Sequence, residues 1–217
     1  MASSKPLTII RAPAKTKSGP VKPRTTVRLG REDWLDAAFR AAISGGFGAV
    51  RVLTLADALG VSRGSFYWHF SDHAELVTAL IDRWYQRAIA TDQGMRSGDL
   101  PDPTKRILHI LDSAIAHSVE DREYDRFEQA LRSLASKDKA VGTLLEEVDR
   151  ARLQMVHAHY LQLVQDDETA REMAALFYLA VVGSHEALNR PSGSAKVSDY
   201  LKSIIAKHLV HAVKTRA

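Results

Sequence analysis

The stretch Leu55–Leu76, LADALGVSRGSFYWHFSDHAEL, decides the fold of the N-terminal part of the chain. Its first residues are apolar at helical spacing and lead to Gly60, a residue that adopts the positive φ at which helices end. Two residues later, Ser62 can begin a second helix by accepting a hydrogen bond from a backbone N–H two or three positions on. Two short helices that meet across a tight turn predict a helix-turn-helix.

The second helix is predicted over residues 63–70 and carries four aromatic residues within five positions. Phe66 and Phe70 are four residues apart, which places both on the face that turns inward. The four rings cannot all face inward, because each residue turns the helix by about 100°. At least one ring is therefore expected on an exposed face that can touch DNA. A small helical domain in which these rings only form the core is the alternative.

The segment GVSRGSFYWHFSDHAEL, residues 60–76, resembles the DNA-binding signature of the TetR family of bacterial repressors. A glycine at the turn, an aromatic residue before His-Phe, and a capped helix directly afterwards occur in that order. The resemblance covers residues 31–80. It implies an all-α protein in which an N-terminal three-helix helix-turn-helix domain is joined by a linker helix to a C-terminal helical ligand-binding and dimerisation domain.

Hydrophobic periodicity predicts further helices along the whole chain. The first covers residues 31–44 and ends at a glycine-rich turn, and the second covers residues 52–59. The linker helix begins at a capping box formed by Asp72 and Glu75 and continues to about Gln93. After a break, helices are expected at residues 104–118, 121–135, 139–165, 167–189 and 197–214. The predicted domains are a disordered basic tail (1–27), a helix-turn-helix domain (28–78) and a helical effector-binding and dimerisation domain (79–217).

The basic charge of the protein is concentrated in its N-terminal tail. The formal net charge is +4, but the first 31 residues hold eight basic residues and no acidic one. The remainder is net negative, so the tail is expected to supply much of the attraction to phosphates, by lying along the DNA backbone or in the minor groove. A solubilising extension is the alternative. Cysteine is absent and no run of eighteen apolar residues occurs, which favours a cytoplasmic protein without a membrane segment.

The resemblance implies DNA contacts of two kinds. Arg63 would reach guanine in the major groove, where Gly64 and Ser65 allow close approach to base edges. Tyr67 and His69 would contact phosphates and so position the helix. The expected DNA-binding residues are Arg51, Thr54, Ser62, Arg63, Gly64, Ser65, Tyr67, Trp68, His69 and His73.

Two positions depart from the family pattern. His73 stands where a phosphate-clamping lysine is usual, and an imidazole carries a full charge only when it is protonated. DNA affinity is therefore expected to rise modestly below about pH 6.5. Leu53 stands where some relatives carry a basic residue that reads bases, so base recognition is expected to depend more on Arg63.

The C-terminal half is rich in Ala, Leu and Val, which fits either an apolar effector pocket or ordinary packing. By resemblance, its last two long helices would form a four-helix bundle with those of a second subunit. The residues expected at this interface are Ala170, Ala174, Leu176, Ala180, Val181, Gly183 and Leu188. The residues expected in a largely hydrophobic pocket are Leu111, Ile115, Phe127, Leu131, Met155, His159, Phe177 and Tyr178.

Together with these patterns, the resemblance implies a homodimeric transcriptional repressor that binds a pseudo-palindromic operator in double-stranded DNA and is released by a small effector. No cofactor motif, catalytic triad or metal motif is recognisable. His157 and His159 lie two apart, on different helix faces, whereas His208 and His211 lie three apart without an evident carboxylate partner. A non-specific DNA binder that depends on the basic tail and a helical enzyme that has kept the head are the alternatives.

Overall fold

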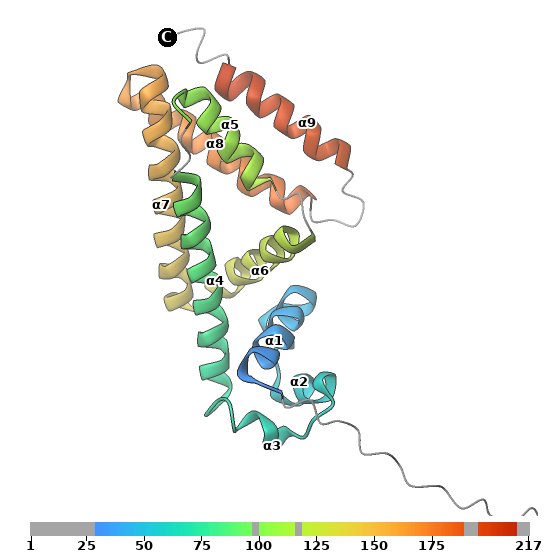
Figure 1. Ribbon diagram of the computed structural model, residues 1–217. Coiled ribbons are helices and arrows are strands. Elements are labelled where there is room, and N and C mark those ends of the chain that lie inside the picture. Colours follow the sequence, from blue (N-terminus) through green and yellow to red (C-terminus); the bar gives the residue numbers. More distant parts are fainter. Residues whose placement is uncertain (1–28, 97–99, 116–118, 189–194, 212–217) are drawn as a thin grey trace, which may run out of the picture.

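A computed structural model describes residues 29–96, 100–115, 119–188 and 195–211, and these residues are helical apart from short connections (Figure 1). The α-helices are α1 (Arg31–Gly45), α2 (Val52–Leu59), α3 (Arg63–Phe66), α4 (His73–Arg96), α5 (Pro103–Ala114), α6 (Val119–Ala135), α7 (Lys139–Val164), α8 (Asp167–Leu188) and α9 (Ala195–Ile205). A 3₁₀ turn, η1 (Phe47–Ala49), follows α1, and a π-helical segment, η2 (Ala206–His211), follows α9. The predicted all-α fold is confirmed.

The helices α1, α2 and α3 and the first turns of α4 form one end of the molecule, which we call the head (Figure 1). Trp34 on α1 and Phe66 on α3 are both fully buried, and their rings meet edge to face with centroids 5.3 Å apart. Phe70 stacks on Phe66 at 5.5 Å. The expectation that Phe66 and Phe70 face inward is confirmed, and this aromatic cluster holds α3 against α1.

The turn between α2 and α3 has the predicted glycine geometry. Gly60 lies in the left-handed region (φ 69°, ψ 31°), and the Val61 N–H donates to the Ala56 carbonyl at 3.0 Å. Ser62 is the N-cap residue of α3, as predicted, but the predicted side-chain hydrogen bond is wrong, because only the Ser62 carbonyl accepts, from the Ser65 N–H. The helix is also shorter than residues 63–70, since turns replace it beyond Phe66.

The start of α4 confirms Asp72 as its N-cap. The Asp72 carboxylate accepts from the Glu75 N–H at 2.8 Å, whereas Glu75 accepts from the Ser71 N–H at 2.7 Å instead of from the Asp72 N–H. This backbone hydrogen bond and the Arg31 guanidinium lower the pKa of Glu75 to about 2. The helix continues to Arg96, three residues beyond the predicted end, because one internal glycine weakens a helix by only about 1 kcal/mol and does not stop it.

The other half of the molecule contains α5, the long α7, α8 and α9 (Figure 1). Its core is separate from that of the head and includes Ile107, Tyr160 and Phe177. Ala170, Ala174 and Val181 are buried in this core within the subunit, so their predicted place in a subunit interface is wrong. The last helix begins at Ala195, two residues before the predicted start, and continues from Ile205 as the π-helical segment η2 to His211, while residues 212–214 lie outside the described residues. No helix in the described ranges has the length and apolarity needed to cross a bilayer.

Helix α6 crosses the molecule between the head and the other half (Figure 1). Phe39 on α1 stacks on Phe127 of α6 at 5.0 Å, and Phe47 contacts the same ring at 5.5 Å. Phe127 is fully buried in the hydrophobic core that also contains the head residues. The core of the head therefore extends into α6, so α6 is well placed to move with the head. The predicted tail lies outside the described residues, and the proposed domain boundaries stay a prediction.

Candidate functional site

An exposed polar surface covers the free end of the head. Trp68 is 87% exposed and Tyr67 52% exposed, although Phe66 and Phe70 on either side are buried. The predicted DNA-binding residues that are exposed here, which we call the end surface, are Arg51, Thr54, Ser62, Arg63, Gly64, Tyr67, Trp68 and His73. Ser65 and His69 are half-buried. The structure thus brings together residues from α2, α3 and the start of α4.

Arg63 and Tyr67 form a pair on the end surface. The Arg63 Nη2 donates to the Tyr67 hydroxyl at 3.0 Å, and the guanidinium carbon lies 5.9 Å from the ring centroid. The pair forms because residues four apart lie on the same face of a helical turn. Tyr67 therefore orients the side chain that was predicted to read bases.

Arg31, at the start of α1, holds the head together, although the sequence analysis only counted it among the basic residues of the first 31. Its Nη1 donates to the His69 carbonyl at 2.7 Å and to the Glu75 carboxylate at 2.9 Å. Its guanidinium also lies 4.1 Å from the centroid of the Phe70 ring. Arg31 thus joins the start of α1 to the end of the recognition segment and to α4. No local pattern marks this role, because the partners lie about 40 residues away in sequence.

His73 and Arg51 hold the segment that precedes α2. The His73 Nε2 lies 2.6 Å from the Val50 carbonyl, and since a carbonyl only accepts, this nitrogen carries the proton. Arg51 donates from Nε to the Gly48 carbonyl at 3.0 Å. His73 therefore has a structural role besides its predicted phosphate contact, and it can approach a phosphate only with Nδ1.

A second candidate site is a cavity of about 160 Å³ between α4, α5, α6, α7 and α8. Three of the predicted pocket residues line it, namely Met155, Phe177 and Tyr178. The other five predicted residues do not line it: Leu111, Ile115, Phe127, Leu131 and His159. The first four of these are core residues, and His159 is buried on α7. A periodic apolar pattern identifies the inward face of a helix but does not distinguish core from cavity.

One wall of this cavity is charged, which the sequence reading did not predict. Arg152 on α7 contacts Glu128 on α6 at 3.1 Å and Asp92 on α4 at 3.4 Å. Arg132 contacts the same Glu128 at 2.8 Å and Asp149 at 2.7 Å. We call these five residues the charge network. A signal was present in the sequence, because acidic and basic residues recur at spacings of four and three along α6, from Asp121 to Arg132.

Burial and pairing act against each other on these carboxyl groups. Burial favours a raised pKa at Glu128, but Arg152 and Arg132 outweigh it and hold the pKa below its ordinary value. Asp125, one turn earlier on α6, shows the opposite result. Burial raises the pKa of Asp125 to about 6, although His185 partly opposes this. Burial thus disfavours the ionised form of Asp125 more than pairing favours it.

The histidines do not form a metal centre in the described part of the chain. No group of three or more His, Asp or Glu side chains there is arranged to hold a metal ion. His157 instead lies 3.0 Å from the Asp167 carboxylate, and His185 lies 2.6 Å from the Ala114 carbonyl.

The end surface belongs to a segment with known relatives. Residues 35–80 match the sequence model of a family described as bacterial regulatory proteins, tetR family. This segment contains α2, α3 and the parts of α1 and α4 that pack against them. Residues 35–80 are a TetR-family domain. The resemblance on residues 60–76 is therefore confirmed.

Individual relatives agree with TetR membership. The HTH-type transcriptional regulator TtgR of Pseudomonas putida is 31% identical over 101 residues, which make up 46% of this chain and 48% of TtgR. The probable HTH-type transcriptional regulator ArpR of Pseudomonas putida matches over the same shares. The chain spans about half the length of the curated relatives it matches.

Solved structures share the TetR-family fold over most of the chain. A transcriptional regulator from Rhodococcus sp. Rha1 has a TM-score of 0.68 at 19% identity, covering 87% of this chain and 98% of that one. A protein from Saccharomonospora viridis, solved in complex with choline, has a TM-score of 0.66 at 17% identity, covering 82% and 95%. At these identities the likeness concerns the fold.

Proposed function

We propose that this protein is a sequence-specific DNA-binding transcriptional regulator. The observation that carries the proposal is the arrangement of α3 and the turn after it: Phe66 is buried, whereas Arg63 on the helix and Tyr67 and Trp68 in the turn are exposed. A short helix with this arrangement can enter the major groove and present side chains to base edges. The TetR match over residues 35–80 supports the same reading.

Within this proposal, Arg63 reads bases and the other residues of the end surface position the head. A guanidinium offers two parallel donors to guanine O6 and N7, which gives base specificity. Tyr67, Trp68 and the Nδ1 face of His73 would contact phosphates or sugars, which fixes orientation without reading sequence.

Selection from a pool of random oligonucleotides is expected to return an inverted repeat with half-sites about 34–36 Å apart or a multiple of it. Replacing Arg63 by Ala should then reduce affinity by roughly 1–3 kcal/mol, concentrated at one base position of each half-site. The measurement is a fluorescence-anisotropy titration against operators with single base changes, at one fixed salt concentration.

Tyr67→Phe is the matched control for this measurement, because it removes the hydroxyl that accepts from Arg63 and keeps the ring. We expect it to weaken all operators about equally. A loss concentrated at the Arg63 base would show instead that Tyr67 acts by holding the guanidinium. An equal loss on every sequence from Arg63→Ala would refute base reading by Arg63.

We propose in addition that the protein acts as a homodimer through α8 and α9. Leu176 and Leu179 on α8 are 49% and 66% exposed, and Tyr200 and Ile204 on α9 are exposed as well. Large apolar side chains gathered on two neighbouring helices favour an interface with another protein surface. A two-fold axis through such an interface would present two heads to one inverted repeat.

Replacing Leu179 by Glu is expected to convert the dimer into monomers at micromolar concentration, because a carboxylate would then be desolvated at the interface. Analytical ultracentrifugation measures the change. Leu161→Glu is the matched control, since Leu161 is an exposed leucine on α7. A protein that stays dimeric after Leu179→Glu would place the interface elsewhere.

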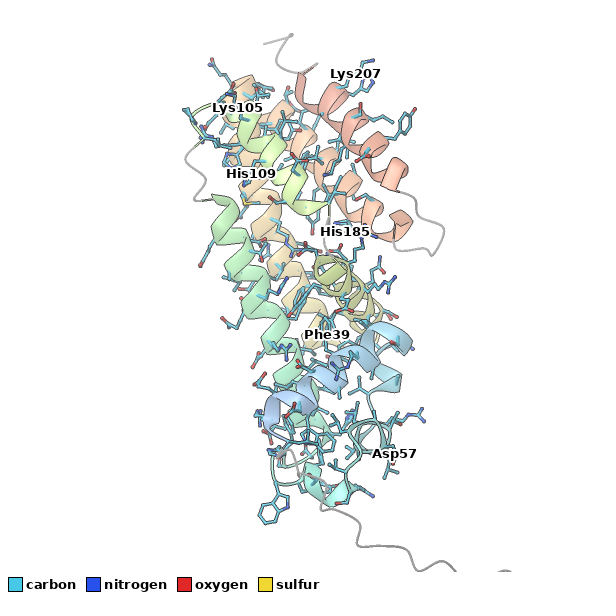
Figure 2. The ribbon with its side chains drawn as sticks, turned by 45° about the vertical axis from the view of Figure 1, so that its right-hand side comes forward. Phe39, Asp57, Lys105, His109, His185 and Lys207 are labelled. Atoms are coloured by element: carbon cyan, nitrogen blue, oxygen red, sulfur yellow. The ribbon has the colours of Figure 1, made fainter. Side chains whose placement is uncertain are left out.

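We propose finally that the protein represses transcription and that a small molecule in the cavity releases it from the operator. Helix α6 supports this proposal because it has two faces with different partners. Phe39 of the head, labelled in Figure 2, stacks on Phe127 of α6, whereas Asp125 and Glu128 line the cavity. If the head has two positions and α6 moves with it, a ligand in the cavity would bind one of these two states more tightly than the other. This difference in affinity is the condition for coupling to DNA binding. The Saccharomonospora viridis protein, which has a similar fold and was solved in complex with choline, supports a small-molecule ligand.

A further inference from the structure

The cavity has two chemically different walls. One wall is apolar and aromatic and includes Trp84, Ile110, Met155, Phe177 and Val181. The other wall is charged and lies mainly on α6. A site with both kinds of wall suits a ligand that has an apolar body and a charged group.

The charged wall carries an excess of negative charge. Its described lining residues include four carboxylates and two guanidinium groups: Asp92, Asp121, Asp125, Glu128, Arg87 and Arg152. Arg152 is shared between Asp92 and Glu128, and Arg87 lies 3.6 Å from Asp121. Among the described side chains, no arginine or lysine forms a salt bridge with Asp125. Asp125 is therefore the carboxylate with the weakest internal compensation.

The neighbour that Asp125 does have is an imidazole. His185 on α8 lies with Nδ1 at 3.8 Å from the Asp125 carboxylate, which is too long for a hydrogen bond (Figure 2). The His185 Nε2 carries a proton, because it lies 2.6 Å from the Ala114 carbonyl. The Nε2 proton of His185 is therefore directed at Ala114 and not at Asp125.

These groups favour one ligand charge over the others. The Asp125 side chain is 21% exposed and has no arginine or lysine partner among the described residues, so its carboxylate is poorly solvated, and burial raises its pKa to about 6. An anionic ligand would add a further negative charge beside Asp121, Asp125 and Glu128. A neutral ligand would displace water from Asp125 without replacing its interactions. A cation placed near the carboxylate would supply them.

We propose that the cavity binds an organic cation, with its ammonium group beside Asp125 and its apolar body against Trp84, Met155 and Phe177. The inference rests on the proposed function only in treating this cavity as the effector site. It replaces the sequence-based expectation of a largely hydrophobic effector with a lipophilic cation. The ring of Tyr178, which also lines the cavity, can add cation–π attraction for such a group, whereas Tyr124 already carries Arg87 3.6 Å from its ring centroid.

Three probes of one size test the ligand charge: benzylammonium, benzyl alcohol and benzoate. We expect the full-length protein at pH 7.5 to bind benzylammonium at least about tenfold more tightly than benzyl alcohol, and benzoate most weakly, as measured by isothermal titration calorimetry. Asp125→Asn should remove most of the preference for benzylammonium and leave benzyl alcohol binding within about twofold. Equal affinity for the three probes, a preference for benzoate, or no binding of any probe would overturn the inference.

Two controls keep the test independent of folding. Asp82→Asn makes the same chemical change at an exposed position on α4 outside the cavity lining, and it should leave the preference for benzylammonium intact. If Asp125→Asn does not fold, the wild-type preference is measured at pH 7.5 and pH 5. It should fall at pH 5 because Asp125, which faces His185 and shares the cavity with Arg87 and Arg152, takes up a proton. A preference unchanged at pH 5 would count against Asp125.

Operator binding separates this inference from the proposed function. If benzylammonium binds through Asp125 but leaves operator affinity unchanged, the ligand class stands and release by this effector fails. If no probe shows the charge preference while the selected operator still binds, the ligand class fails and the DNA-binding regulator stands.

Discussion

Replacing Arg152 by Met is expected to lower the free energy of unfolding by roughly 3–5 kcal/mol. Arg152 contacts Glu128 on α6 and Asp92 on α4, and both carboxylates are mostly buried. Removing the guanidinium takes this ion-pair partner away from Asp92. Glu128 keeps its ion pair with Arg132 but loses the one with Arg152. A buried carboxylate that loses its counter-charge is poorly solvated, which is why breaking one side of such a pair is more damaging than replacing the whole pair. Urea unfolding followed by circular dichroism measures the loss.

The pH dependence of this loss identifies its cause. Because the arginines hold the pKa of Glu128 below its ordinary value, the stabilisation is present above the unfolded-state pKa and disappears as pH falls through the folded-state pKa. The difference between Arg152→Met and wild type should therefore be largest near neutral pH and shrink below about pH 4. Arg150→Met, an exposed change on the same helix, should alter stability by no more than about 0.5 kcal/mol. A loss that is the same at about pH 3 and at pH 7 would indicate lost packing and not lost charge pairing.

Replacing Phe66 by Ala is expected to destabilise the protein by about 3–5 kcal/mol and to abolish operator binding with it. Phe66 is fully buried, and it contacts the rings of Trp34, Tyr67 and Phe70. Its removal opens a cavity at the point where α3 rests on α1. Thermal unfolding and an operator titration on the same sample measure the two effects.

Trp68→Ala is the matched comparison, because Trp68 is also an aromatic residue of this segment but is 87% exposed. It should change stability by no more than about 0.5 kcal/mol and still weaken operator binding, since the exposed ring is available only to a partner. If Trp68→Ala binds the operator as tightly as wild type, the end surface does not use this ring. If Phe66→Ala stays as stable as wild type, the aromatic cluster does not hold the head together.

Much of the head could be read from the sequence because its signals are local. The αL conformation of Gly60, the cap at Asp72 and the inward direction of Phe66 and Phe70 each depend on residues within a few positions. At Ser62 the local pattern predicted the cap position but not the hydrogen bond. The Ser65 N–H donates to the Ser62 backbone carbonyl and not to its side chain.

The cavity could not be read in the same way. Leu111 and Met155 both lie on inward helix faces, yet Leu111 packs in the core and only Met155 lines the cavity. Which of the two side chains lines the cavity depends on how five helices pack together, and no local sequence pattern contains that information. The excess negative charge beside Asp125 has the same origin, since its neighbours come from α4, α7 and α8 as well as from α6.

By itself, the sequence determined the all-helical class, the helix-turn-helix and the exposed face of α3, because hydrophobic period and turn chemistry act between near neighbours. Only the tertiary structure decided the position of Arg31 across the head, the continuation of the core of the head into α6, and the charge of the cavity wall. Each of these depends on residues far apart in the chain, whose distances are fixed only when the helices pack.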